Sequence, residues 1–154
     1  MRNHIHSSHH FRIAAPPATA FMFFTPAGEE LWVAGWQPAY LHPADGTTCE
    51  GMVFTTGAAE QFTIWHLASF DRAARRSRYV RTTPALRTGM VDIACDPAGE
   101  GASEVRVSYT LTALTAPGQA SLAAFEGESF AGMIEGWRAE IESRLPQLMA
   151  ASIR

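Results

Sequence analysis

The C-terminal segment FAGMIEGWRAEIESRLPQL, residues 130–148, decides the fold that we expect from this sequence. Its apolar residues recur at steps of three and four, which predicts the stripe of an amphipathic helix; they are Phe130, Met133, Ile134, Trp137, Ile141, Leu145 and Leu148. On the polar side, Glu140 and Arg144 stand at positions i and i+4, a spacing that favours an ion pair. Pro146 should end or kink the helix near Leu145, because proline lacks a backbone N–H.

Strand patterns upstream supply a surface for this helix to cover. Residues 105–112 alternate apolar and polar side chains, which is typical of a strand with one buried face and one wet face. An alternating run at 4–13 predicts the first strand of the chain. Short turn signals divide residues 48–115 into five more strands and predict antiparallel pairing; they lie at 57–59, 71–74, 83–85 and 96–101.

Two short helices are expected after the first strand. One follows Pro16-Pro17, since proline costs nothing in the first turn of a helix. The other begins at Pro26, with Thr25 as its N-cap and Glu29 near its positive end. Residues 33–48 contain two prolines and an Asp-Gly turn signal, so we expect an irregular connection there.

These elements predict one α+β domain spanning residues 1–154. A sheet with one wet face needs its other face covered, and the C-terminal helix is the element large enough to cover it. The expected architecture is therefore a helix grip. A curved six-stranded antiparallel sheet wraps around the long C-terminal helix, and the two short helices follow the first strand.

Composition excludes several classes of partner. Hydrophobic residues make up 47% of the chain, and the formal net charge is −3, which gives no broad positive surface for nucleic acid or anionic lipid. We therefore expect neither nucleic acid nor a membrane as partner. Cys49 and Cys95 form no Cys-x-x-Cys pair, and the N-terminal sequence has no apolar segment followed by a cleavage site. Free thiols and a cytoplasmic location are expected.

Histidines near the N-terminus raise the question of a metal site; they are His4, His6, His9 and His10. No acid or cysteine nearby completes a ligand set, so we expect no metal. The sequence also lacks a Walker loop, a dinucleotide fingerprint, a His-Glu-x-x-His motif and a Gly-x-Ser-x-Gly elbow. No cofactor is expected.

Four segments carry a resemblance to a known superfamily: FRIAAPPA (11–18), FTPAGEELWVAGWQP (24–38), EGMVFTT (50–56) and SFAGMIEGW (129–137). Together they resemble the START-like (SRPBCC) superfamily, which includes polyketide cyclases and dehydratases, lipid-transport domains, plant pathogenesis-related carriers and activators of a heat-shock chaperone ATPase. The resemblance implies a cavity between the sheet and the C-terminal helix that opens near the short helices. The glycine-rich loop of the plant carriers is reduced here to Gly57-Ala-Ala, so a phosphate-cradling loop is not expected.

Three functions fit this resemblance, because fold alone does not decide function. The first is binding of a small hydrophobic molecule, such as an aromatic, polyketide-like or acyl compound, in the internal cavity. The second is an aromatase, cyclase or dehydratase acting on such a molecule. The third is an interaction module of the chaperone-activator kind. Whether a reaction is catalysed stays open at this point, and so does a homodimer.

The first pair of candidate catalytic residues depends on the register of one hairpin. A tight turn at Gly57-Ala-Ala sets these residues opposite one another: Thr56 and Glu60, Phe54 and Phe62, Met52 and Ile64, Glu50 and His66. A carboxylate beside an imidazole over the cavity could act as a general base, whereas the same pair at a wet rim would have no catalytic role. A register shifted by one residue would turn Trp65 and Leu67 inward instead.

A second pair of candidate catalytic residues lies on the next strand. If Arg76 and Arg78 face water, then Tyr79 and Arg81 face the helix. Arg81 and Arg87 could also clamp a ligand carboxylate in a bidentate fork. The alternative is that both extend to solvent, as arginines at strand ends often do.

We expect the cavity wall to be mostly aromatic and apolar, with a lid over its mouth formed by Trp32, Trp36 and Tyr40. The candidate ligand-binding residues are Trp32, Trp36, Tyr40, Met52, Phe54, Trp65, His66, Tyr79, Arg81, Tyr109, Phe130, Met133 and Trp137. Core packing is the alternative role for each tryptophan.

Overall fold

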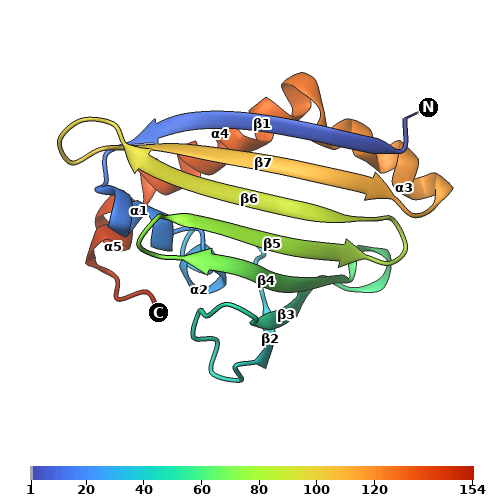
Figure 1. Ribbon diagram of the computed structural model, residues 1–154, viewed down its shortest axis with the longest axis horizontal. Coiled ribbons are helices and arrows are strands. Elements are labelled where there is room, and N and C mark those ends of the chain that lie inside the picture. Colours follow the sequence, from blue (N-terminus) through green and yellow to red (C-terminus); the bar gives the residue numbers. More distant parts are fainter. Residues whose placement is uncertain (1) are drawn as a thin grey trace.

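A computed structural model describes residues 2–154 as one curved antiparallel sheet with helices behind it (Figure 1). The strands are β1 (His4–Ile13), β2 (Ala39–His42), β3 (Val53–Thr56), β4 (Thr63–Asp71), β5 (Arg76–Thr83), β6 (Arg87–Pro97) and β7 (Ser103–Ala113). The helices are α1 (Pro17–Met22), α2 (Pro26–Glu29), α3 (Ala116–Ser121), α4 (Gly127–Ser143) and α5 (Leu145–Ala150), with short 3-10 turns η1 (Ala59–Gln61) and η2 (Leu122–Phe125). The predicted α+β helix-grip architecture is confirmed.

The sheet has seven strands in the order β1-β7-β6-β5-β4-β3-β2, one more than the six predicted. Strands β2 to β7 follow one another as antiparallel neighbours, and β1 pairs with β7. The additional strand, β2, lies in the stretch 33–48 that was expected to be irregular, and it pairs with β3 at the edge of the sheet. Pro38 and Pro43 flank it, which is where a strand tolerates proline.

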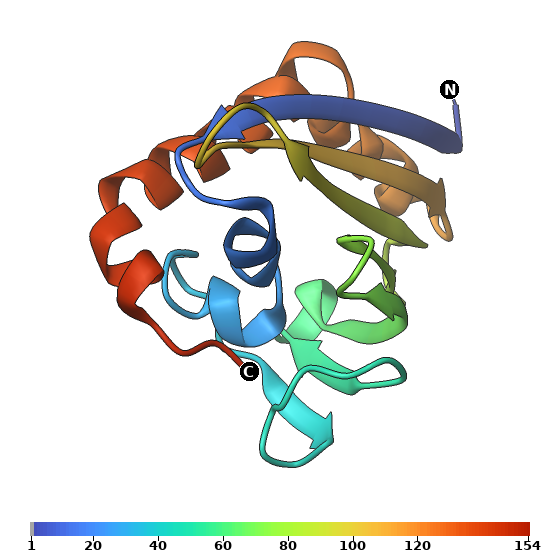
Figure 2. The same cartoon turned by 60° about the vertical axis from the view of Figure 1, so that its left-hand side comes forward.

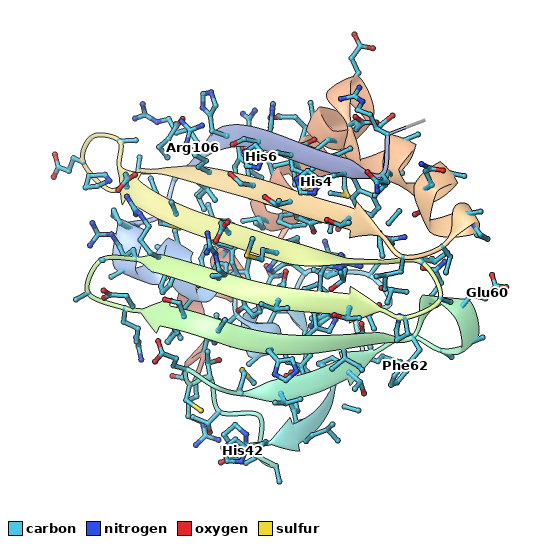
Figure 3. The ribbon with its side chains drawn as sticks, turned by 45° about the vertical axis from the view of Figure 1, so that its right-hand side comes forward. His4, His6, His42, Glu60, Phe62 and Arg106 are labelled. Atoms are coloured by element: carbon cyan, nitrogen blue, oxygen red, sulfur yellow. The ribbon has the colours of Figure 1, made fainter. Side chains whose placement is uncertain are left out.

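The alternation predicted for β7 is confirmed. Val105, Val107 and Leu111 are fully buried, while Arg106 is exposed on the outer face together with His4 and His6 of β1 (Figure 3). The Nδ1 atoms of His4 and His6 lie 2.8 and 2.9 Å from the hydroxyls of the threonines opposite them on β7. These histidines therefore take part in cross-strand polar pairs on the outer face.

The C-terminal helix forms as its apolar stripe predicts. Phe130, Ile134 and Ile141 are buried, and α4 packs against β1. It ends at Ser143, and α5 begins at Leu145 with a proline in its first turn, so the predicted break is confirmed. The predicted ion pair between Glu140 and Arg144 is also present.

Residues 116–125, which the sequence patterns did not assign, form α3 and η2, which follow β7 and precede α4 along the chain. Thr115 caps α3 by accepting a hydrogen bond from the Gly118 N–H at 3.0 Å. A Cβ at position 118 would lie 1.6 Å from the carbonyl oxygen of Leu86, so only glycine fits at this close approach.

The two short helices lie between the sheet and the C-terminal helices (Figure 2). As predicted, Thr25 caps α2, and its hydroxyl accepts a hydrogen bond from the Gly28 N–H at 3.0 Å. Residues 20–26 are all buried, which explains the apolar run between the two helices. Phe24 of this buried segment lines the candidate site.

The tight-turn register considered for β3 and β4 is wrong, and the alternative orientation, with Trp65 and Leu67 facing inward, is observed. The connection is longer than a tight turn, because η1 occupies part of it, and Thr56 pairs with Thr63 rather than with Glu60. The register moves by three residues, and an odd shift turns every side chain of the strand to the other face. Trp65 is therefore buried, and His66 is exposed.

Both cysteines are free thiols. Burial raises the pKa of Cys95 to about 12, so this thiol is unreactive at neutral pH. Within residues 2–154, none of the helices combines the length and apolar character required to span a lipid bilayer.

Candidate ligand-binding site

A cavity of about 240 Å³ lies on the inner side of the sheet. Strands β3 to β7, the segment around α2, and α4 all contribute to its wall. The lining residues are Phe24, Glu29, Val33, Trp36, Phe54, Thr56, Gln61, Thr63, Trp65, Tyr79, Arg81, Val91, Ile93, Tyr109 and Trp137. Gln61 is exposed, which places an opening at the connection between β3 and β4.

Four aromatic rings form one wall of the cavity. Phe54 and Trp65 are direct cross-strand partners and stack with ring centres 5.6 Å apart and planes within 5°. Trp36 meets both rings edge-on at 5.9 and 5.7 Å, and Tyr79 does so at 6.4 and 6.1 Å. Edge-to-face and stacked pairs of this kind each contribute about 0.5–1.5 kcal/mol beyond their area. The wall is therefore rigid and preformed.

Trp137 brings α4 into the site. Its ring lies 6.4 Å from Phe24 and 6.4 Å from Tyr109, so it connects the segment before α2 to β7. Trp32 packs edge-on against Trp137 at 5.8 Å from the buried side, and its Nε1 donates to the Phe23 carbonyl at 2.8 Å. Trp32 thus supports the wall from behind and is no part of a lid.

The hydroxyl of Tyr79 forms a hydrogen bond within the protein. It donates to the carbonyl oxygen of Phe24 at 3.0 Å, which fixes β5 to the segment before α2. Burial raises the pKa of Tyr79 well above its usual value, and the nearby Glu29 and Tyr40 add to the effect. The side chain is a neutral hydrogen-bond donor at physiological pH.

Glu29 contributes a carboxyl group to the cavity wall. From the sequence we expected this residue only to stabilise the N-terminal end of a short helix. Burial raises the pKa of its carboxyl well above the usual range, and the residue keeps some accessible area because it lines the cavity. The Val33 N–H donates to the Glu29 carbonyl at 2.8 Å, one helical turn that sets Glu29 and Val33 on the same side. That i, i+4 spacing was the signal that could have found Glu29.

Two arginines approach one another at the same side of the cavity. Arg81 lines it, and its guanidinium carbon lies 4.7 Å from the centre of the Trp65 ring. Arg87 is buried, and its Nη1 donates to the Ser121 hydroxyl at 2.9 Å. Burial lowers the pKa of Arg87, and the charge of Arg81 lowers it further. Burial raises the pKa of Tyr109, an effect that the charge of Arg81 and its hydrogen bond to Tyr109 partly offset.

The inward orientation predicted for Tyr79 and Arg81 agrees with the structure, whereas the pair of Glu50 and His66 does not form. Glu50 lies before β3 and is exposed, and its Oε1 accepts from the Phe70 N–H at 3.2 Å. His66 faces outward opposite Val53, because the odd register shift moved it to the outer face. Neither side chain lines the cavity.

Just over half of the predicted ligand-binding residues meet at the cavity: Trp36, Phe54, Trp65, Tyr79, Arg81, Tyr109 and Trp137. The others do not line it: Trp32, Tyr40, Met52, His66, Phe130 and Met133. Tyr40 lies on β2, where its hydroxyl donates to Glu30 Oε2 at 2.8 Å. Met52 and Phe130 are buried in the core. The lining residues that were not among these candidates are four polar residues, three aliphatic residues and one phenylalanine, namely Glu29, Thr56, Gln61, Thr63, Val33, Val91, Ile93 and Phe24.

A larger hollow of about 390 Å³ lies on the outer face of the sheet, over β4 to β7. Two of its three arginines are already neutralised, since Arg78 binds Asp92 at 2.7 Å and Arg76 binds Asp96 at 2.9 Å, and the third, Arg106, is exposed to water. These side chains are half-exposed, so water screens their charges. We therefore place the candidate site on the inner side.

The remaining N-terminal histidines bind carboxylates singly. His9 Nε2 lies 2.7 Å from Glu135 Oε2 and so joins β1 to α4, and His10 contacts Glu104. No three ligand-type side chains gather closely enough to hold a metal ion within the described part of the chain.

Comparisons with known proteins find the fold and no close relative. No family model matches the sequence, and no curated protein is a significant match. Among solved structures, norcoclaurine synthase from Thalictrum flavum in complex with dopamine and hydroxybenzaldehyde matches with a TM-score of 0.64 at 12% identity, covering 91% of this chain and 87% of the synthase. The major latex-like protein 151 of Panax ginseng matches with a TM-score of 0.66 at 12% identity, over 93% and 98% of the two chains.

A protein of Thermus thermophilus matches with a TM-score of 0.62 at 13% identity, over 96% and 99% of the chains. Identities this low establish the fold alone. The chain shares the helix-grip fold of these proteins, as the resemblance implied.

Proposed function

We propose that this protein binds a small aromatic molecule in the cavity between its sheet and α4. The observation that carries the proposal is the cavity itself, about 240 Å³ of space walled by preformed aromatic rings. Small-molecule sites are concave and mostly apolar, with a few polar groups that orient the ligand. Here Glu29, Arg81 and Thr63 supply such groups among the rings.

The volume favours an aromatic ligand over a long acyl chain. Drug-sized ligands occupy pockets of roughly 300–1,000 Å³, and this cavity is smaller. A flat molecule of one or two rings fits that space and can stack on Phe54, Trp65 or Trp36. Norcoclaurine synthase, which shares the fold, was solved with two small aromatic molecules, and this supports the same ligand class here.

A second candidate function is catalysis of proton transfer on such a ligand, as in an aromatase, cyclase or dehydratase. Glu29 favours it, because a carboxyl whose pKa is raised by burial is suited to act as a general acid or base near neutral pH. Tyr79 and Arg81 line the same cavity and could orient the reacting group. Turnover lost in Glu29→Gln with ligand affinity retained would support this function.

Within residues 2–154, the exposed apolar side chains do not favour the interaction module. The large apolar side chains that are exposed within residues 2–154 lie on different elements, for example Leu41 on β2 and Met149 on α5. Protein-binding surfaces need a contiguous apolar patch of several hundred square ångströms.

The test is titration with 2-naphthol, a neutral two-ring probe, followed by calorimetry. Val33→Phe places a ring inside the cavity and should abolish binding while the protein stays folded. Leu41→Phe is the matched control, because Leu41 is exposed on β2 away from the cavity and the substitution should leave binding unchanged. Equal binding by the wild type and Val33→Phe would contradict the proposal.

A further inference from the structure

Two positive charges at one side of the cavity have no acidic partner. Neither Arg81 nor Arg87 forms an ion pair with any carboxylate in residues 2–154, whereas Arg76, Arg78 and Arg138 do. Arg106 on the outer face also lacks an ion pair, but it is exposed to water. Charged groups removed from water are normally paired, because burying an unpaired charge is costly. The pair of arginines therefore needs an explanation beyond core packing.

Arg81 is partly exposed, and the protein around it pairs few of its donors. Its guanidinium lies over the Trp65 ring at 4.7 Å and within 6.0 Å of the centres of Tyr109 and Phe125. Aromatic faces attract a cation but accept no in-plane hydrogen bonds comparable to those of a carboxylate. The Nε of Arg81 is buried and finds no hydrogen-bond partner among the described residues. A guanidinium has five N–H donors, and the bond to Tyr109 uses only part of them.

Arg87 supplies a second charge behind Arg81. It is only 6% exposed, lies over Phe125 at 4.6 Å, and its Nε is likewise buried without a partner among residues 2–154. Its hydrogen bond to Ser121 holds it in place. Arg87 is buried whereas Arg81 is partly exposed. The two like charges repel one another, and an anion beside Arg81 would relieve that repulsion.

Glu29, the acid in the same cavity wall, does not play this part. Burial alone accounts for its raised pKa, and within the described chain no ion pair joins it to Arg81. Within the described chain, Arg81 thus has no carboxylate partner, and Glu29 has no cationic partner.

We infer that the ligand is an aromatic carboxylate, and that Arg81 binds its carboxylate while Arg87 strengthens the positive potential at that end. This inference rests on the proposed function and names its ligand class. A carboxylate matches the planar fork of a guanidinium with two parallel hydrogen bonds. A single arginine in a cavity of this size suits one planar monoanion.

The test compares two probes that differ in charge but hardly in shape, 2-naphthoate and 2-naphthamide, by isothermal titration calorimetry. The wild type should bind 2-naphthoate roughly 10- to 100-fold more tightly than the amide, the effect of one charge-assisted pair. Arg81→Gln should remove that preference, so that the two probes bind with similar affinity. Arg106→Gln is the matched control, since it deletes the same charge on the outer face of β7 (Figure 3).

The outcomes separate the two proposals. Equal binding of both probes by the wild type would overturn the carboxylate inference and leave the proposed function standing. Binding of neither probe would contradict both. If Arg81→Gln does not fold, the comparison of the two probes on the wild type still decides. A preference for 2-naphthoate that Arg106→Gln abolishes would also overturn the inference, because it would place the anion on the outer face.

Discussion

Truncation of Phe54 to alanine tests the register that builds the cavity wall. Phe54 is fully buried and its ring meets four others, those of Trp65, Trp36, Tyr79 and Tyr40, at centre distances of 5.6 to 6.4 Å. Phe-to-Ala substitutions in cores cost about 3–5 kcal/mol, and the ring contacts place this one near the upper end. For a domain of this length, a loss of about 4–5 kcal/mol lowers the melting temperature by roughly 8–20 °C.

The matched control is the same substitution at Phe62. In the register expected from the sequence these two phenylalanines face each other, whereas in the structure Phe62 is 39% exposed at the end of the sheet (Figure 3). Phe62→Ala should change the stability by no more than about 0.5 kcal/mol. Thermal and urea unfolding, followed by circular dichroism, measure both variants under identical conditions.

A double-mutant cycle makes the test specific for the register. Phe54→Ala and Trp65→Ala should couple by about 0.5–1.5 kcal/mol, because the two rings stack directly. Phe54→Ala and Phe62→Ala should be additive within about 0.5 kcal/mol. A costly Phe62→Ala, or coupling between the two phenylalanines instead, would refute the observed register.

Three further perturbations probe the site and its supports. Burial raises the folded-state pKa of Glu29, so the folded protein binds more protons than the unfolded chain and stability falls as pH rises above the ordinary glutamate value of about 4.3. Glu29→Gln should remove that slope and raise the melting temperature at pH 7; an unchanged slope argues against a buried carboxyl. Tyr79→Phe leaves the Phe24 carbonyl unpaired and should cost about 1–3 kcal/mol in urea unfolding, and a neutral effect would show that this bond is not made. The hydrogen bond from His9 lowers the pKa of Glu135. The stabilisation of the folded state by this bond is therefore present at neutral pH and is lost as the pH falls through the lowered pKa. Because the side chain is 43% exposed, Glu135→Gln should cost at most about 1 kcal/mol at pH 7 and less at pH 3; equal losses at both would contradict the assignment.

Most of the architecture could be predicted because its signals are local. The alternation in β7, the stripe of α4 and the break before Pro146 all follow from side-chain spacing along one element. The short strand β2 could not be predicted, since its pairing with β3 depends on contacts between segments and its flanking prolines indicate a loop.

The site was predicted less well because it depends on how strands meet. The sequence Gly57-Ala-Ala indicated a tight turn. In the structure Gly57 has φ +74°, and a Cβ there would lie 2.5 Å from the Gln61 carbonyl oxygen, a close approach made by the longer connection through η1. Nothing in the sequence distinguishes the two connections, and their difference reverses the faces of β4. Tyr79 and Arg81 were placed correctly because their strand contains no such ambiguity.

A crystal structure of the protein grown with 2-naphthoate would show whether an aromatic carboxylate occupies this cavity. We expect density for the two rings inside the cavity, beside Trp65, with the carboxylate oxygens within hydrogen-bond distance of Arg81. An empty cavity with 2-naphthoate bound in the arginine-lined hollow on the outer face of the sheet would contradict this expectation.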